Sequence, residues 1–164
     1  MSLLPLASIT LDGVVLFFHV LAAIVAFGPT FAYGILLATA VKANQAAVPT
    51  VIDGVRRVDS ILGLPGLIVL IVTGVWLVLD SGLPWDWSET FVSVGLTAAV
   101  ILLAMFLFYL RPLTRQGAEL AARDIKASGQ LSEEFEALSK RIAMGGQVAT
   151  LVVLVSLFFM VVKP

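Results

Sequence analysis

Four long stretches of uncharged, mainly apolar residues follow one another along the chain, separated by polar segments. They cover residues 13–41, 60–79, 90–110 and 142–162. Each stretch reaches the roughly 20 residues that a helix needs to cross the hydrocarbon core of a bilayer. The pattern predicts an all-α integral membrane protein, in which residues 1–164 form one domain built as a four-transmembrane-helix bundle.

The segment between the third and fourth stretches has a different pattern, with apolar residues three and four positions apart among polar ones. The apolar positions are Leu131, Phe135, Leu138 and Ile142. This spacing is typical of an amphipathic helix. Residues 127–130 favour a break, and Ser132 is suited to cap the helix that follows. We therefore expect a helical hairpin over residues 112–141, solvated and touching lipid, outside the membrane.

The first stretch is longer than one crossing requires. As a helix it would extend about 45 Å, against a hydrocarbon core of about 30 Å. Pro29 lacks a backbone N–H and leaves the carbonyl of Val25 without its helical partner, so a bend is expected there. In the second stretch Gly63, Pro65, Gly66 and Gly74 favour close packing against a neighbouring helix and local irregularity.

Composition supports the membrane class, because only 13% of the residues are charged and 60% are hydrophobic. A soluble domain has about 25% charged residues. The net charge of -1 argues against a nucleic-acid partner, and the absence of cysteine excludes disulfides and thiolate metal sites within this chain. The expected partners are the lipid bilayer and either a second copy of the chain or another membrane protein.

The distribution of basic residues predicts the orientation. Between the first and second stretches and between the third and fourth lie Lys42, Arg56, Arg57, Arg111, Arg115, Arg123, Lys126, Lys140 and Arg141. Because basic residues favour the cytoplasmic side, both termini are expected on the non-cytoplasmic side of a plasma or bacterial inner membrane, which the chain crosses several times. The hairpin is then cytoplasmic. On the opposite side, Trp85 and Trp87 in the loop Asp80–Glu89 predict an interfacial anchor.

One ionisable side chain, His19, lies within the apolar stretches, about two turns into the first. Ionisable groups at this depth usually face the interior of the bundle. At helical spacing its face continues through Ala22, Ala23, Ala26, Thr30 and Tyr33. A neutral imidazole can ligate haem iron or copper, and this small, partly polar face suits a flat cofactor. The alternative is a packed histidine that is hydrogen-bonded to a backbone carbonyl or a threonine.

Sulfur and hydroxyl side chains supply further candidates. The methionines of interest are Met105, Met144 and Met160. Their thioethers could ligate copper or haem iron, although methionines in apolar helices are usually core residues. Thr73, Gln147 and Thr150 are expected to form hydrogen bonds that pack the helices.

Charged residues at the start of the second stretch are expected to anchor the membrane boundary. Arg56 and Arg57 are interpreted as partners of Asp53 and Asp59, with binding of propionates or anionic lipid as the alternative. We expect no buried carboxylate. That expectation argues against a proton-coupled transporter, which usually requires an intramembrane Asp or Glu.

Two ends of the chain carry a family resemblance. Phe18–Ala23 in the first stretch and Phe159–Pro164 at the terminus resemble a family of short predicted integral membrane proteins of bacteria. That family is similar to the HemJ-type protoporphyrinogen oxidases and to the membrane domain of copper-resistance protein D, which also share a second span like Leu64–Leu67 followed by Thr73-Gly74.

The resemblance implies binding of haem b, with a first-span histidine and a third-span lysine as important residues. Only the histidine carries over, to His19, because residues 90–110 contain no lysine. The second axial ligand would be Met105, Met144 or His19 of another subunit.

Three functions follow as hypotheses. The first is a haem-associated, redox-active membrane protein with His19 as axial ligand. The second is a non-enzymatic accessory or structural membrane subunit in which His19 only packs. The third is transport of copper or a small solute along the face of His19, Thr30 and Tyr33.

Overall fold

Four long helical runs form the molecule. The computed structural model describes residues 10–79 and 85–163, and every regular element within them is helical. Leu11–Ala43, Gln45–Leu79, Thr90–Ser128 and Glu133–Val162 are each long and apolar enough to cross a membrane. The predicted all-α bundle of four membrane-spanning helices is therefore confirmed. The first part of the predicted loop Asp80–Glu89 lies outside the described residues.

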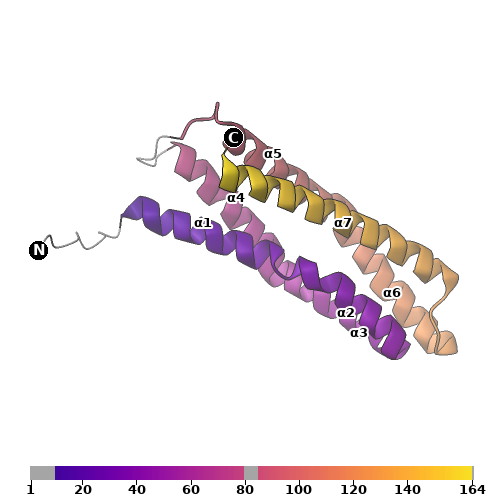
Figure 1. Ribbon diagram of the computed structural model, residues 1–164. Helices are drawn as coiled ribbons and strands as arrows, with labels where there is room; N and C mark the ends of the chain where they lie inside the picture. The colour runs from indigo at the N-terminus through magenta and orange to yellow at the C-terminus, as the bar shows by residue number, and fades with distance from the viewer. Residues whose placement is uncertain (1–9, 80–84, 164) are drawn as a thin grey trace, which may run out of the picture.

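The runs are divided into shorter elements by breaks and wider turns. In chain order these are α1 (Leu11–Phe27), α2 (Thr30–Ala43), η1 (Gln45–Ala47), α3 (Val48–Val58), η2 (Asp59–Gly63), α4 (Leu64–Leu79), α5 (Thr90–Met105), η3 (Phe106–Leu110), α6 (Arg111–Ser128) and α7 (Glu133–Val162). Figure 1 shows that the start of α1 and the end of α7 lie at one end of the bundle. We call this the terminal end, and the opposite end, where α6 meets α7, the hairpin end.

The first run changes direction at Gly28 and Pro29, which separate α1 from α2. The amide of Gly28 still donates to the carbonyl of Ile24 at 2.8 Å, and the hydroxyl of Thr30 donates to the carbonyl of Phe27 at 2.6 Å. Pro29 has no N–H to give to Val25. The bend predicted from the proline is thus present; the helical hydrogen bonds of α1 continue up to Gly28, and the Thr30 hydroxyl bonds the carbonyl of Phe27 across the break.

Two π-helical turns interrupt the second and third runs, and each ends two residues before a proline. The turn η2 precedes Pro65, and η3 precedes Pro112. A proline removes one helical N–H and its ring displaces the carbonyl four residues earlier. A widened turn accommodates both effects while the helix continues. The irregularity predicted near Gly63 is explained by this arrangement.

Small residues bring α1 and α4 close together. Ala22 and Ala26 are buried on α1, and a Cβ atom added to Gly66 of α4 would lie 3.1 Å from the Cβ of Ala26 and 3.3 Å from the carbonyl oxygen of Ala22. Such approach of backbones is how membrane helices gain van der Waals contact without a hydrophobic driving force. The small-residue packing predicted for the second stretch is confirmed.

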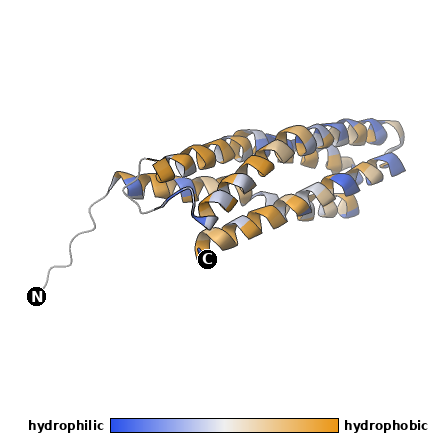
Figure 2. Cartoon of the chain, turned by 90° about the horizontal axis from the view of Figure 1, so that it is seen from above, coloured by the Kyte–Doolittle hydropathy of each residue, from blue (hydrophilic) through white to orange (hydrophobic). Residues whose placement is uncertain are grey.

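The hairpin end has an apolar core of its own, separate from the core near Ala26 and Leu67. Its buried members are Ala40, Val48, Ile52, Ala118, Ala121 and Phe135. They join α2, α3, α6 and the start of α7, and α3 packs along α6. Hydrophilic residues are frequent on the outside of this end, whereas the rest of the bundle is mainly hydrophobic outside (Figure 2).

The prediction of a solvated, lipid-touching hairpin is therefore wrong in one respect. Phe135, from the predicted apolar stripe, is only 2% exposed and packs against Val48 and Ile52 rather than lipid. The break itself is confirmed: Gly129 has a left-handed φ of 73°, and the hydroxyl of Ser132 caps α7 by accepting from the amide of Phe135 at 3.3 Å. The hairpin packs onto α3 because its stripe is protein-facing.

Candidate functional site

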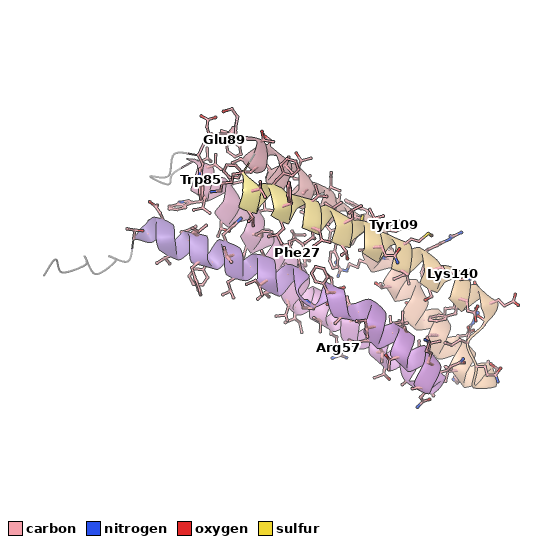
Figure 3. The ribbon with its side chains drawn as sticks, in the orientation of Figure 1. Phe27, Arg57, Trp85, Glu89, Tyr109 and Lys140 are labelled. Atoms are coloured by element: carbon pink, nitrogen blue, oxygen red, sulfur yellow. The ribbon has the colours of Figure 1, made fainter. Side chains whose placement is uncertain are left out.

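An apolar cavity of about 690 Å³ lies among α1, α4, α5 and α7. Within the bundle α1 packs along α4 and α5 along α7, whereas α1 and α7 contribute walls on either side of the cavity. Trp85 at the terminal end and Phe27 near the middle of the molecule both line it (Figure 3). The cavity thus follows the bundle from its terminal end to about mid-length.

His19 is the histidine of this chain, and its side chain lines the cavity from α1. Its Nδ1 lies 2.9 Å from the hydroxyl oxygen of Thr73 on α4. The Thr73 hydroxyl donates its own proton to the carbonyl of Val69, 2.6 Å away. A hydroxyl has only one proton to donate, so its oxygen must accept from the imidazole. This hydrogen-bond network assigns the imidazole proton to Nδ1, in the tautomer that leaves the lone pair on Nε2.

The lone pair of Nε2 stays accessible. Within the described part of the chain, no hydrogen bond to Nε2 is present and no side-chain nitrogen or oxygen is buried without a partner. The ring lies against α4 because Gly74 has no side chain: a Cβ there would be 3.0 Å from Cε1 of His19. An imidazole with a bonded Nδ1–H and an accessible Nε2 is the arrangement that metal-binding histidines use.

The methionines divide between the cavity and the rest of the bundle. Met160 lines the cavity from α7, and its methyl group occupies the space that a side chain on Gly95 of α5 would fill. Met105 and Met144 are not among the residues that line the cavity, and Met144 is 56% exposed. The structure therefore brings Met160, rather than the two methionines favoured on the sequence, to the cavity of His19.

The terminal end of the cavity carries a cation among aromatic rings. The Nζ atom of Lys163 lies 4.4 Å from the centroid of the Trp85 ring and 5.0 Å from that of Phe91. The two rings meet edge to face at 5.8 Å. All three residues line the cavity. The predicted interfacial tryptophan Trp85 thus also contributes to the wall of the site.

The other residues predicted on the face of His19 lie elsewhere. The hydroxyl of Tyr33 donates to Oδ1 of Asp59 at 2.9 Å, next to the π-helical turn. Asp59 was expected to pair with arginine, so this interpretation is corrected. Asp53 does pair with an arginine, but at 3.0 Å with Arg56, three residues on, rather than with Arg57, four residues on. Thr30 and Tyr33 do not line the cavity. The sequence spacing places them on one face, but among the described residues of α2 it is Phe31, not Thr30 or Tyr33, that lines the cavity.

Two further expectations about polar residues need correction. Asp124 on α6 is only 7% exposed, so a buried carboxylate does exist, at the hairpin end. Thr150 donates to the carbonyl of Gly146 in its own helix at 2.9 Å and does not bridge helices. Thr73 does join two helices, through His19. In the part of the chain that the structure describes, no group of three or more His, Cys, Asp or Glu side chains could hold a metal ion.

Sequence reasoning missed Lys163 as a cavity residue and named Met160 only as one of three candidate thioethers. Met160 lies on α7 and Lys163 is its C-cap, and nothing in the local pattern of α7 reveals which helix it faces across the cavity. The small Gly95 opposite Met160 is a weak signal, because glycine in an apolar helix often receives a bulky neighbour.

Comparison with known proteins supports the membrane class. No curated protein and no solved structure matches the chain. The resemblance to HemJ-type and copper-resistance proteins stays a prediction. A family described as "Predicted integral membrane protein (DUF2269)" matches residues 13–164. Together with the four apolar helices, this match shows that the chain is a multi-pass membrane protein that belongs to the DUF2269 family of predicted integral membrane proteins.

Proposed function

We propose that this protein binds haem b in the cavity among α1, α4, α5 and α7, with Nε2 of His19 as an axial ligand to the iron. The observation that carries the proposal is the hydrogen bond from Nδ1 of His19 to Thr73, which leaves the Nε2 lone pair accessible on a cavity wall. Metal-ligating histidines almost always donate their other ring N–H to a neighbouring acceptor in this way.

The residues of the cavity fit such a cofactor. Its volume of about 690 Å³ falls in the range of ligand sites, about 300–1,000 Å³. The walls are overwhelmingly apolar, as a membrane-embedded porphyrin requires. Met160 offers a thioether from α7 for the second axial position, a ligand that cytochromes also use.

The protein would supply orientation and exclusion of water. Haem, when bound, would provide one-electron redox chemistry. His19 would hold the iron, Thr73 would keep the imidazole in one tautomer and one orientation, and the apolar side chains would keep water from the ring. An apolar environment and a thioether ligand both influence the reduction potential of a haem.

We also propose that the terminal end faces the non-cytoplasmic side of a plasma or bacterial inner membrane. Basic residues support this orientation. Lys140, with its neighbour Arg141, lies toward the hairpin end (Figure 3), and Arg111 begins α6, the helix that leads to that end, whereas Lys163 caps α7 at the terminal end. In this orientation the core around Phe135 lies in the cytoplasm and the cavity lies within the membrane.

Replacing His19 by alanine tests the haem proposal. Wild-type protein purified in detergent, from cells supplied with a haem precursor, is expected to show a Soret band and about one iron per chain. The His19→Ala variant is expected to lose that band, whereas Met144→Leu, on an exposed position of α7, should retain it. Iron and copper are quantified in the same samples. A wild-type protein that stays colourless after haem titration, or an unchanged spectrum in His19→Ala, contradicts the proposal.

Replacing Thr73 by valine tests the role of the hydrogen bond. Valine has nearly the same shape but cannot accept from Nδ1, so the haem affinity is expected to fall by about tenfold, the lower limit for loss of such a supporting contact. Thr73→Ser keeps the hydroxyl and should retain the wild-type affinity. Haem titration followed by absorption measures all three proteins. Equal affinities of the wild type and Thr73→Val would show that the threonine does not position the imidazole.

A further inference from the structure

We infer that Lys163 binds an acidic group of the cavity's ligand, so that the site selects a dicarboxylic tetrapyrrole over a neutral one. The inference rests on the proposed function in taking the tetrapyrrole as the occupant, but it concerns the other end of the ligand from the iron. It follows from the position of one ammonium group at the terminal end of an otherwise apolar cavity.

The backbone holds Lys163 at this position. It is the C-cap of α7, with a left-handed φ of 49°, and its amide donates to the carbonyl of Phe159 at 3.0 Å. A left-handed residue other than glycine costs free energy unless its surroundings favour it. Here the side chain turns over the rings of Trp85 and Phe91, at 4.4 and 5.0 Å. The cation–π contacts offset part of that cost and fix the ammonium group at the rim.

The ammonium group has no carboxylate partner among the described residues. The ion pairs in this part of the chain involve Arg56, Arg115 and Arg123, and none involves Lys163. Of the nearby acidic residues, Asp86 accepts from the amide of Ser88 at 2.9 Å. Aromatic contacts do not neutralise a full positive charge. Lys163, an exposed residue at the rim of the cavity, therefore retains the capacity to bind an anion.

The site thus offers two recognition points of different chemistry. His19 is eight residues from the start of α1, about 12 Å along the helix, and presents a lone pair within the cavity. Lys163 presents a positive charge at the terminal end of the same cavity. A ligand that satisfies both has an apolar body, a metal centre and a carboxylate at one edge. A haem with two propionates has these features, whereas a fatty acid could use the lysine alone.

Metal-free porphyrins separate the lysine from the histidine, because they offer no iron to His19. We would titrate the full-length protein in detergent with protoporphyrin IX and with its dimethyl ester, following quenching of tryptophan fluorescence. The wild type is expected to bind the diacid about tenfold more tightly than the ester, a difference of 1.4 kcal/mol. Lys163→Ala should abolish this preference, and Lys163→Arg should retain it. Lys140→Ala, an exposed lysine at the other end of α7, is the matched control and should behave as the wild type.

The outcomes distinguish the two proposals. Equal affinity of the wild type for the diacid and the ester, or a preference that survives in Lys163→Ala, overturns the role of Lys163 even if a Soret band depends on His19. A lysine-dependent preference without a His19-dependent Soret band supports the role of Lys163 and refutes haem ligation. Displacement of the diacid by oleate at lower concentration than by haem would overturn the tetrapyrrole as occupant in favour of a fatty acid. Binding of neither porphyrin overturns the role of Lys163, whereas ligation of haem iron by His19 is judged separately by the Soret band.

Discussion

Replacing Gly66 by leucine is expected to lower the free energy of unfolding by about 3 kcal/mol, the upper part of the usual range for overpacking. A Cβ at this position would lie 3.1 Å from the Cβ of Ala26, 3.2 Å from its backbone nitrogen and 3.3 Å from the carbonyl oxygen of Ala22. Two of these three atoms belong to the backbone of α1 and cannot rotate away. The larger side chain must therefore move α1 away from α4.

The separation should also reach the site, because His19 and Thr73 belong to these two helices. The thermal midpoint in detergent, followed by size-exclusion chromatography of heated samples, measures the loss of stability, and haem titration measures the effect on the cavity. Gly34→Leu is the matched control. Gly34 is a glycine of the first helical run, as Gly66 is of the second, but nothing lies within 4 Å of a Cβ added at Gly34. If Gly66→Leu and Gly34→Leu had the same thermal midpoint, close packing of α1 on α4 would not stabilise the fold.

The membrane architecture was predictable because its signals are local. Length and hydropathy indicate the four spans, and Pro29 indicates the bend, since the missing N–H acts on its own helix whatever the neighbours are. The small residues Ala22, Ala26 and Gly66 likewise predicted a close helix contact. These features need no knowledge of which helix lies beside which.

The hairpin end was harder to predict, because its helices bury an interface with protein rather than with lipid or water. The stripe of Phe135 and Leu138 has the same periodicity whether it faces lipid or α3. Its partner, the amphipathic helix α3, contributes Val48 and Ile52 to the core. Charged residues such as Asp53 and Arg56 follow them in the same helix. Only the tertiary arrangement shows that the two segments cover each other.

The site illustrates the same division. His19 could be identified as a candidate because an ionisable residue in a membrane helix is rare. Its acceptor Thr73 was predicted to join helices, and it does so through His19. From the sequence, Met160 could not be preferred to Met105 or Met144 as a ligand, and Lys163 could not be recognised as a cavity residue. Both depend on the rotation of α7 about its axis. That rotation is set by packing of α7 on α5, where the methyl group of Met160 lies on Gly95.

Cavity and hairpin end are connected through continuous helices. The helix pair α6–α7 at the hairpin end continues into α5 and the membrane part of α7, which form two walls of the cavity. Gln45 in η1 accepts from the amide of Leu131 at 3.0 Å and ties the first half of the chain to the hairpin. Stability of the hairpin end should therefore help to hold α1 and α7 on opposite sides of the cavity. The stability of the hairpin end can be changed by pH through Asp124, whose carboxylate is bonded there.

Acidification is expected to destabilise the hairpin end through Asp124. Its Oδ2 accepts from the amide of Ser132 at 3.0 Å and from the hydroxyl of that residue, and its Oδ1 accepts from Nη2 of Arg123 at 3.1 Å. The bonds from Ser132, followed by those from Arg123, lower the pKa of Asp124 below its ordinary value. The folded protein then binds this proton more weakly than the unfolded chain does. The stabilisation is complete above the unfolded pKa of about 3.9 and is lost as the pH falls through the lower folded pKa.

Asp124→Asn isolates this contribution, because asparagine still offers an oxygen to Ser132 but carries no charge. At neutral pH the variant should have a lower thermal midpoint than the wild type, since the interaction with Arg123 is weakened. As the pH falls from about 3.9 through the lower folded pKa, the difference should shrink, because the wild type loses its carboxylate while the variant has none to lose. Glu119→Gln, which removes an exposed ion pair with Arg115, is the control and should keep most of the wild-type pH dependence. A difference between the wild type and Asp124→Asn that stays constant or grows on acidification would mean that the charge of Asp124 does not stabilise the hairpin end.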